Sequence, residues 1–434
     1  MDVATPPQSP RAVKNACDVA LLLCIGLLPV LTVSTSRGGS VAFYAACVFS
    51  LVGLCLEARQ SEPSRTPYWH SYWPLVVSLA LAPLTPLLSS ALLDARLHGS
   101  DLERGLRFWA IALIVASLAQ IDRERLKLTL WGLAAAAWVA SITIIHLAWI
   151  TGERPEPEEY NAVSYGNLTL LLGVLMLFAL GSRTTRWPRL EAAAKLVTGG
   201  VAIYAFALTL TRGGWLAVPV FSLVALALAG QRRWVLKAGI FVAVIAGCAA
   251  VLYANHDLRS RVELAANEVV QCRNDKLADT SICTRLQLWS AAWRMFRAAP
   301  LTGNGSGSLF PEKLQEQAAH GKVSPTVAAN FGEPHNDLLY AMANYGLPGL
   351  AALLAIYLAP SAYFLRRLRQ GSPDGKSATA MGLVVCLGFA AFGLTELMFR
   401  GMRTIGLYAT LTALLLAMSA PGGFSAHSAH KSIP

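Results

Sequence analysis

Runs of about 17–25 mostly apolar residues recur along this chain, and a helix of that length crosses the roughly 30 Å hydrocarbon core of a bilayer. In lipid, a helix satisfies its own backbone hydrogen bonds. The composition agrees, because 55% of the residues are hydrophobic and only 14% are charged. We predict an all-α integral membrane protein with about twelve spans. They are 16–34, 40–57, 72–93, 106–121, 128–151, 167–182, 196–211, 216–230, 238–255, 337–365, 380–399 and 405–420.

The predicted spans divide the chain into four parts. Residues 1–255 carry the first nine spans, 256–336 form one large polar loop, and 337–420 carry the last three spans. Residues 421–434, rich in Gly, Ser and His, are expected to be a disordered cytoplasmic tail. Arg11 and Lys14 precede the first span without a small-residue cleavage site, so we expect this span to be retained.

Lysine and arginine are concentrated in alternate short loops, such as 123–127 and 183–195, and cytoplasmic loops carry such an excess. This distribution puts both termini in the cytoplasm and the large loop on the other side. In a Gram-negative inner membrane that side is the periplasm. Much of the net charge of +11 is this topological signal, so it does not indicate nucleic-acid binding. The outer turns still carry several arginines, a surplus that suggests an anionic ligand.

The large loop is predicted to contain three helices, over 258–270, 284–296 and 310–320, with a glycine-rich turn at 300–307. Cys272 and Cys283 could close a disulfide in an oxidising compartment. No Cys/His cluster suggests a metal. The second helix carries an apolar stripe at spacings of three and four, made of Leu286, Trp289, Trp293 and Phe296.

His335 lies where the loop returns to the membrane. Pro334 suits the first turn of a helix, which would place His335 at the outer mouth of the tenth span. Gly346 and Pro348 are expected to kink that span. A histidine here is either structural or a general base, since its charge changes near neutral pH. Three neighbours could orient it: Glu333, Asn336 and Asp337.

Arginines in the outer turns are the second set of candidates. Arg212 precedes a Gly-Gly pair that permits close approach of a ligand, and Arg285 begins the striped helix. A guanidinium matches phosphate oxygens in a bidentate manner, but each arginine could equally be an interfacial or solvated charge. The same two alternatives apply to Arg37, Arg400 and Arg403.

The remaining polar residues are expected to be structural or fall inside apolar spans. Glu396 is expected to pair with Arg400 at helical i,i+4 spacing, and the acidic turn 153–159 is expected to be solvated. Asp18 and His146 fall inside apolar spans, where ionisable groups are functional candidates. Their roles remain open.

Three ordered segments resemble the O-antigen ligase/polymerase superfamily. Thr211-Arg212-Gly213-Gly214-Trp215-Leu216-Ala217 resembles its S-R-G-[AG]-W-L-A turn. Arg285-Leu286-Gln287-Leu288-Trp289, followed by Pro300-Leu301-Thr302-Gly303-Asn304-Gly305, resembles its R-x-x-x-W and P-[LI]-x-G-x-G segment. His335-Asn336-Asp337-Leu338-Leu339, followed by Gly346-Leu347-Pro348-Gly349, resembles its H-N-x-[FL]-L and G-[LI]-x-G segment. The resemblance covers roughly 196–365.

The resemblance implies a multi-pass glycosyltransferase of the GT-C type that takes a glycan from undecaprenyl pyrophosphate on the periplasmic face. Its ligase branch transfers the glycan to a sugar hydroxyl of lipid A–core, without a metal or other cofactor and with inversion. His335 would be the general base, and Arg212 and Arg285 would bind the pyrophosphate. The implied partners are the undecaprenyl pyrophosphate-linked O-antigen, the lipid A–core acceptor and membrane lipids.

Three alternatives remain beside the ligase. An O-antigen polymerase would hand the glycan to another lipid-linked glycan, and a protein O-oligosaccharyltransferase to serine or threonine. The third is a lipid-linked glycan transporter or flippase, which about twelve spans with one kinked span would also suit. Transporters often contain repeated halves and midplane charges, and neither pattern is evident in this sequence.

Overall fold

The computed structural model describes residues 10–60, 69–94, 96–157, 160–228, 239, 256–370 and 375–420. Helices make up 81% of the structure, and no strand occurs in these ranges. The all-α prediction is confirmed at this level. The predicted span 238–255, apart from residue 239, and the tail 421–434 lie outside the described residues.

Seven of the described helical stretches are long and apolar enough to cross a membrane, as expected of an integral membrane protein. The count of twelve spans stays a prediction. Helix α4 (Gly99–Leu118) is long enough but begins with several charged residues, and three apolar stretches are shorter: η2 (Gly213–Leu216) with α9 (Ala217–Leu228), α16 (Lys376–Phe392) and α17 (Met402–Met418). The seven stretches that are long and apolar enough to cross a membrane are α1 (Pro10–Ser34), α2 (Gly38–Gln60), α3 (Trp69–Leu92), α5 (Arg123–Lys127) with α6 (Leu130–Thr151), α7 (Ala162–Phe178), α8 (Pro188–Leu208) and α15 (Asp337–Gln370).

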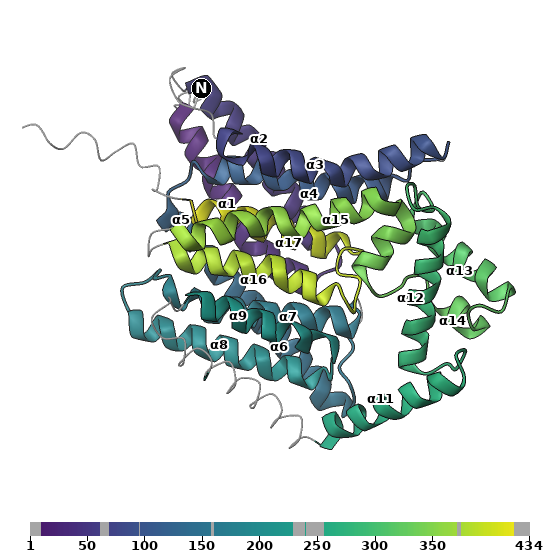
Figure 1. Ribbon diagram of the computed structural model, residues 1–434. Coiled ribbons are helices and arrows are strands. Elements are labelled where there is room, and N and C mark those ends of the chain that lie inside the picture. The colour runs from purple at the N-terminus through teal and green to yellow at the C-terminus, as the bar shows by residue number, and fades with distance from the viewer. Residues whose placement is uncertain are drawn as a thin grey trace, which may run out of the picture.

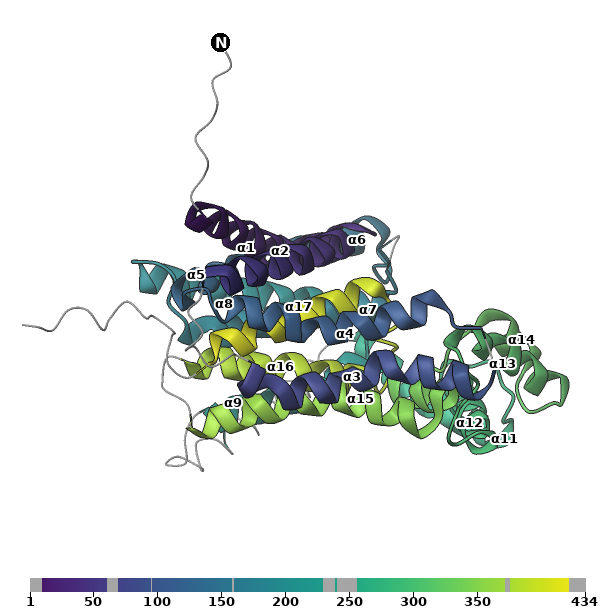
Figure 2. The same ribbon diagram turned by 90° about the horizontal axis from the view of Figure 1, so that it is seen from above.

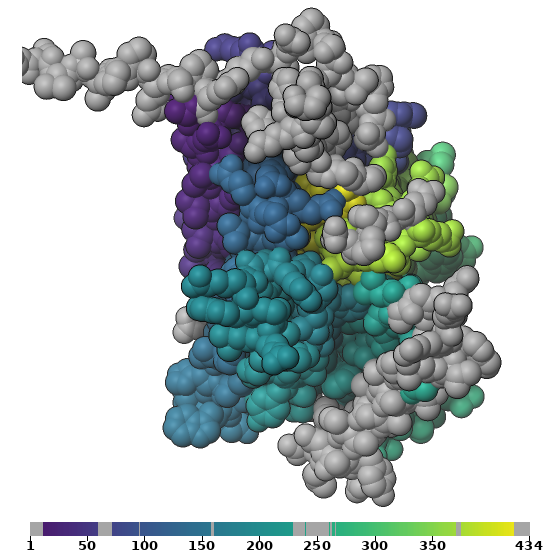
Figure 3. Space-filling model, turned by 90° about the vertical axis from the view of Figure 1, so that its left-hand side faces the viewer, coloured from purple at the N-terminus to yellow at the C-terminus, as the bar shows by residue number. Residues whose placement is uncertain are grey.

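The apolar helices lie side by side as a bundle, and the helices of the large loop lie beyond one end of it (Figure 1, Figure 2). Helix α17 packs against α4 and α2, whereas α16 packs against α7, α9 and α15. Both C-terminal helices are apolar nearly all round and are buried along almost their whole length. They therefore join the N-terminal helices to the middle ones. At the end away from the loop, purple, blue, teal and yellow segments come together (Figure 3).

The large loop folds into four α-helices and one 3-10 helix. They are α11 (His256–Asn274), α12 (Ser281–Ala298), η4 (Gly307–Leu309), α13 (Phe310–Ala319) and α14 (Pro325–Asn330). The three predicted helices correspond to α11, α12 and α13. A disulfide joins Cys272 to Cys283, with Cα atoms 5.3 Å apart, and ties α11 to α12.

The apolar stripe of α12 is not the face that the helix buries in the loop core. Leu286 and Trp293 are each 46% exposed. The face against the loop core instead contains Leu288, Ala291 and Met295. That face meets residues of the other loop helices, such as Phe310 of α13 and Val327 of α14. The larger aromatic residues of α12 lie at its margin and outside.

The glycine-rich turn docks onto the kink of α15. Backbone N–H groups of Asn304 and Gly305 donate to the carbonyls of Ala343 and Asn344, and Leu347 N–H donates to Pro300 O at 2.8 Å. The kink at Gly346 is confirmed, since its φ is 63° and its ψ −149°. A Cβ on Gly303 or Gly346 would meet the facing backbone. These glycines therefore fix the loop to the bundle.

Candidate functional site

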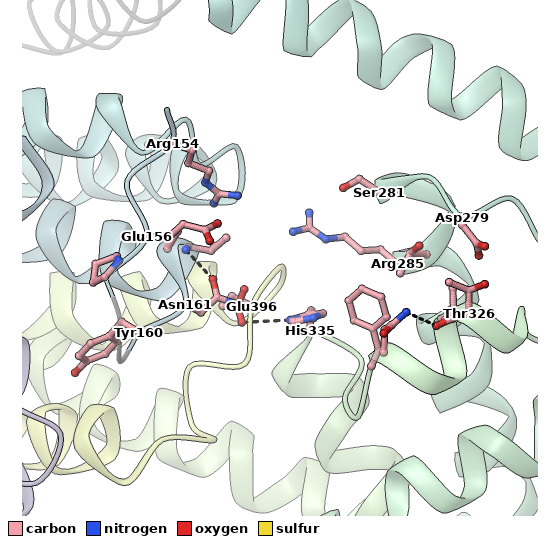
Figure 4. A pocket seen from close by; sticks show the side chains of 17 residues that line it. Arg154, Glu156, Tyr160, Asn161, Asp279, Ser281, Arg285, Thr326, His335 and Glu396 are labelled. Atoms are coloured by element: carbon pink, nitrogen blue, oxygen red, sulfur yellow. Dashed lines mark hydrogen bonds and ion pairs between the residues drawn. The ribbon is translucent and has the colours of Figure 1, made fainter. Parts of the chain in front are cut away.

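A cavity of about 1010 Å³ lies between the bundle and the loop. On the bundle side it is lined by the turn between α6 and α7, including Arg154 and Tyr160. On the loop side it is lined by Arg285 of α12 and Thr326 of α14. His335 lies between the two sides (Figure 4). Two residues singled out in the sequence, His335 and Arg285, thus line the same cavity.

His335 is held by its neighbours in an uncommon backbone conformation. Its φ is 47°, a left-handed value that a non-glycine residue adopts at some cost. Its Nδ1 lies 3.3 Å from Oε1 of Glu396 and 3.7 Å from Oε1 of Glu333. Trp289 Nε1–H of α12 donates to Pro334 O at 3.0 Å. Because the carboxylates lie at Nδ1, the ring is placed to keep its other nitrogen for a ligand.

Helix α15 begins at Asp337, three residues after Pro334, so the expectation that Pro334 lies in the first helical turn is wrong. Pro334 and His335 therefore precede the helix instead of forming its first turn. Phe331 meets the His335 ring edge-on, with centroids 5.9 Å apart. The segment before the helix is thus a shaped loop, and its conformation sets the direction of the histidine.

Asn336 and Asp337 form hydrogen bonds with the backbone of the segment after α16 and not with the ring of His335. Asn336 Nδ2 donates to Leu394 O at 2.9 Å, and Asp337 N–H donates to Gly393 O at 2.7 Å. The Asp337 carboxylate accepts from Tyr357 Oη at 2.9 Å. The bonds to Gly393 and Leu394 hold the start of α15 against the segment between α16 and α17, whereas Tyr357 lies within α15 itself. Of the three expected orienting residues, Glu333 is the one whose carboxylate lies beside the ring.

The expected pair between Glu396 and Arg400 is wrong. Glu396, which is 3% exposed, lies against His335, and Arg400 forms an ion pair with Glu333. The reason is local: the residues after α16 form turns and not a continuous helix, so i,i+4 side chains do not share a face. Burial lowers the pKa of Arg400, and the positive charge of Arg104 lowers it further.

Arg212 lies beside the site but outside the described lining of the cavity. It precedes η2, and the adjoining Gly213 lies against the side chain of Thr395, the neighbour of Glu396. Arg154 of the cavity donates from Nε to Thr209 O at 3.0 Å, three residues before Arg212. Gly213 therefore allows the Arg212 turn to approach the segment that carries Glu396, whereas Gly214 lies against Asn167 and Phe206.

The remaining predicted arginines are dispersed. The Arg403 guanidinium lies 4.0 Å from the centroid of the Tyr160 ring, and Tyr160 lines the cavity. Arg37 lies in the turn between α1 and α2, outside the described lining. Asp18 is paired with Lys14 at 2.8 Å, so its charge is balanced within α1. His146 is exposed on the outside of α6.

Sequence reasoning missed the turn between α6 and α7. It was expected to be solvated, yet Arg154, Glu156 and Tyr160 line the cavity. The only local signal was one arginine and one tyrosine among acidic and proline residues. Proximity to His335 depends on the packing of α7 beside α16, which no short sequence window contains.

The carboxylates beside His335 also form a possible cation site. Glu333, His335 and Glu396 place one ligand atom each within 4.8 Å of one another. Arg400 already pairs with the second oxygen of Glu333 and brings a positive charge to the same place. That charge opposes a divalent cation, so the donor set fits a metal poorly.

Comparison with known proteins finds one relative and one family to which part of the chain is similar. A protein of Haemophilus influenzae described as "Uncharacterized protein" is 23% identical over 261 residues. The match spans 59% of this chain and 65%, less than two thirds, of that relative. Residues 197–354 match the family described as O-Antigen ligase, a range that includes Arg212, Arg285 and His335. This segment of the chain is therefore similar to the O-antigen ligase family.

Proposed function

We propose that the protein is a lipopolysaccharide O-antigen ligase. It transfers a glycan from undecaprenyl pyrophosphate to a sugar hydroxyl of lipid A–core. The observation that carries the proposal is the shared cavity of His335 and Arg285, in which Glu396 lies 3.3 Å from the histidine Nδ1. His335 offers a base, and Arg285 offers a permanent positive charge.

The reaction needs only these two kinds of group. The acceptor oxygen forms a bond to the anomeric carbon, while the bond from that carbon to the pyrophosphate oxygen breaks. The proton of the hydroxyl passes to Nε2 of His335, whose Nδ1–H donates to Glu396. The departing lipid pyrophosphate keeps the electron pair. A single displacement of this kind inverts the anomeric configuration.

Arginine is suited to the leaving group. Pyrophosphate gains negative charge as the bond breaks, and fixed positive groups that face this charge lower the barrier. Arg285 lies in the cavity, and Arg212 lies next to the segment that carries Glu396. Guanidinium groups remain charged at all relevant pH values and bind phosphate oxygens in a bidentate manner. The proposed reaction therefore requires no metal.

The location of the site supports the binding of two substrates that are both anchored in the membrane. The cavity lies at the loop end of the bundle, where apolar helices give way to the polar loop helices. By the distribution of lysine and arginine this end faces the periplasm, with both termini in the cytoplasm. A substrate anchored in the outer leaflet of the inner membrane would present its sugars at this level.

The test is transfer by the purified protein, with undecaprenyl pyrophosphate-linked glycan as donor and lipid A–core as acceptor. We expect glycosylated lipid A–core to form equally with and without a chelator. Extension of the lipid-linked glycan without the core acceptor would support a polymerase instead, and transfer to a serine-containing peptide an oligosaccharyltransferase. Movement of donor across vesicles without transfer would support a transporter. Loss of activity on chelation would contradict the metal-independent reaction.

A further inference from the structure

A second hollow lies between α1 and α6, at the same end of the bundle as the site. Its volume is about 460 Å³. Val139, Thr143 and Leu147 follow one another along one face of α6 at spacings of four, and Val33 of α1 lies opposite. We call this hollow the α1–α6 groove. Eight residues of helix rise about 12 Å, so the groove reaches into the apolar part of the bundle.

The outer end of the groove is built from fixed polar contacts. Tyr160 Oη donates to Thr32 O at 2.6 Å, and Tyr165 Oη donates to Val33 O at 3.0 Å. Both tyrosines thus bind the last carbonyls of α1, and their rings meet edge-on at 5.1 Å. The groove is therefore a preformed feature and not a loose gap between two helices.

Arg403 places a positive charge at this outer end. Its guanidinium stacks on the Tyr160 ring at 4.0 Å, and its Nη1 donates to Thr35 O at 3.2 Å. The contact with the aromatic ring holds the guanidinium at the outer end of the groove. A guanidinium keeps its positive charge when it donates to a carbonyl, so Arg403 attracts a phosphate to this end of the groove while it is bound to Thr35.

The groove and the site cavity meet. Pro157 and Tyr160 line both of them. A molecule with a hydrocarbon chain in the groove would therefore have its head at the edge of the cavity that contains His335. Arg403 lies at that junction because it stacks on Tyr160.

We propose that the α1–α6 groove binds the first isoprene units of the donor lipid, with Arg403 on the phosphate that carries the chain. This rests on the proposed function. In a prenyl pyrophosphate the chain is attached directly to a phosphate, so chain site and phosphate site must adjoin. In lipid A–core, sugars separate the acyl chains from the accepting hydroxyl. The short distance between groove and cavity therefore favours the donor.

The experiment measures binding of undecaprenyl pyrophosphate, without glycan or acceptor, to the purified full chain. Thr143→Trp and Leu147→Trp each fill the groove and are expected to weaken binding about tenfold, as when about two methylene groups lose their burial. Ile142→Trp is the matched control, because Ile142 is 57% exposed on the neighbouring face of α6. Arg403→Gln is expected to weaken undecaprenyl monophosphate and pyrophosphate equally, since both carry the proximal phosphate.

A second measurement uses the unaltered protein and so does not depend on the folding of a variant. A prenyl pyrophosphate with a benzophenone in its first isoprene units should crosslink to the peptide containing 139–147. Crosslinking elsewhere, or unchanged binding by both tryptophan variants, would contradict the proposal that the groove binds the lipid chain. Wild-type protein that binds the lipid but transfers no glycan overturns the proposed function and leaves the groove intact. Failure of the wild-type protein to bind undecaprenyl pyrophosphate overturns both.

Discussion

Nδ1 of His335 lies 3.3 Å from Oε1 of Glu396, although 61 residues separate them in the chain. The two meet because Asp337 N–H and the Asn336 amide bind the carbonyls of Gly393 and Leu394. These bonds join the start of α15 to the turn after α16. The pair is therefore a product of helix packing, and its consequences can be measured separately from those of the arginines.

Replacement of His335 by Ala should reduce kcat by at least about 10²-fold, the lower range for loss of a general base. The reduction follows from the loss of the group that accepts the hydroxyl proton. The measurement is single-turnover transfer by purified protein, with the thermal midpoint recorded in parallel. Near-normal transfer by His335→Ala would remove the histidine from the reaction.

Glu396→Gln should lower kcat by about tenfold or more while leaving the KM for the donor nearly unchanged. The amide keeps the volume of the side chain but removes the negative charge that stabilises a protonated imidazole. Steady-state kinetics with varied donor separates the two effects.

Glu316→Gln is a suitable control, because Glu316 is a solvent-exposed carboxylate of α13 that pairs with Lys313. The two variants make the same chemical change in different places. A rise in donor KM without a fall in kcat for Glu396→Gln would show that Glu396 serves donor binding instead of the histidine.

Arg285→Ala and Arg212→Ala should weaken use of the donor. A charge-assisted hydrogen bond contributes about 1.5–3 kcal/mol, so we expect kcat/KM for the donor to fall roughly 10- to 150-fold in each case. Arg297→Ala, an exposed arginine near the end of the same helix as Arg285, should have little effect. An increase in the KM for the acceptor alone would show that these arginines bind the acceptor and not the donor.

Gly303→Ala should lower the thermal midpoint more than Gly321→Ala does. Both glycines have positive φ, 62° and 65°, so both variants incur the left-handed strain of about 1–2 kcal/mol. Only at Gly303 would the added Cβ also meet the backbone of Asn344 and Tyr345, whereas Gly321 faces open space. Equal midpoints for the two variants would contradict the docking of the loop onto α15.

Helices and kinks could be predicted from short stretches of the sequence. Helices α11, α12 and α13 follow from periodicity, whereas the short α14 was not predicted. The kink at Gly346 follows from Gly and Pro in one span. The partners of the polar residues were not readable in this way. The i,i+4 spacing of Glu396 and Arg400 predicts a pair only in a helix. The chain forms turns there, and Glu396 lies against His335 instead.

By itself, the sequence determined that the chain is helical and membrane-embedded, and which loop carries polar side chains, because hydrophobicity and helical periodicity act over neighbouring residues. It also singled out His335 and Arg285. Only the tertiary structure decided that these two share a cavity, that Glu396 and Glu333 flank the imidazole, and that Arg154 and Tyr160 complete the opposite wall. Those relations depend on contacts between helices far apart in the chain, whose geometry is set by packing and close glycine approach.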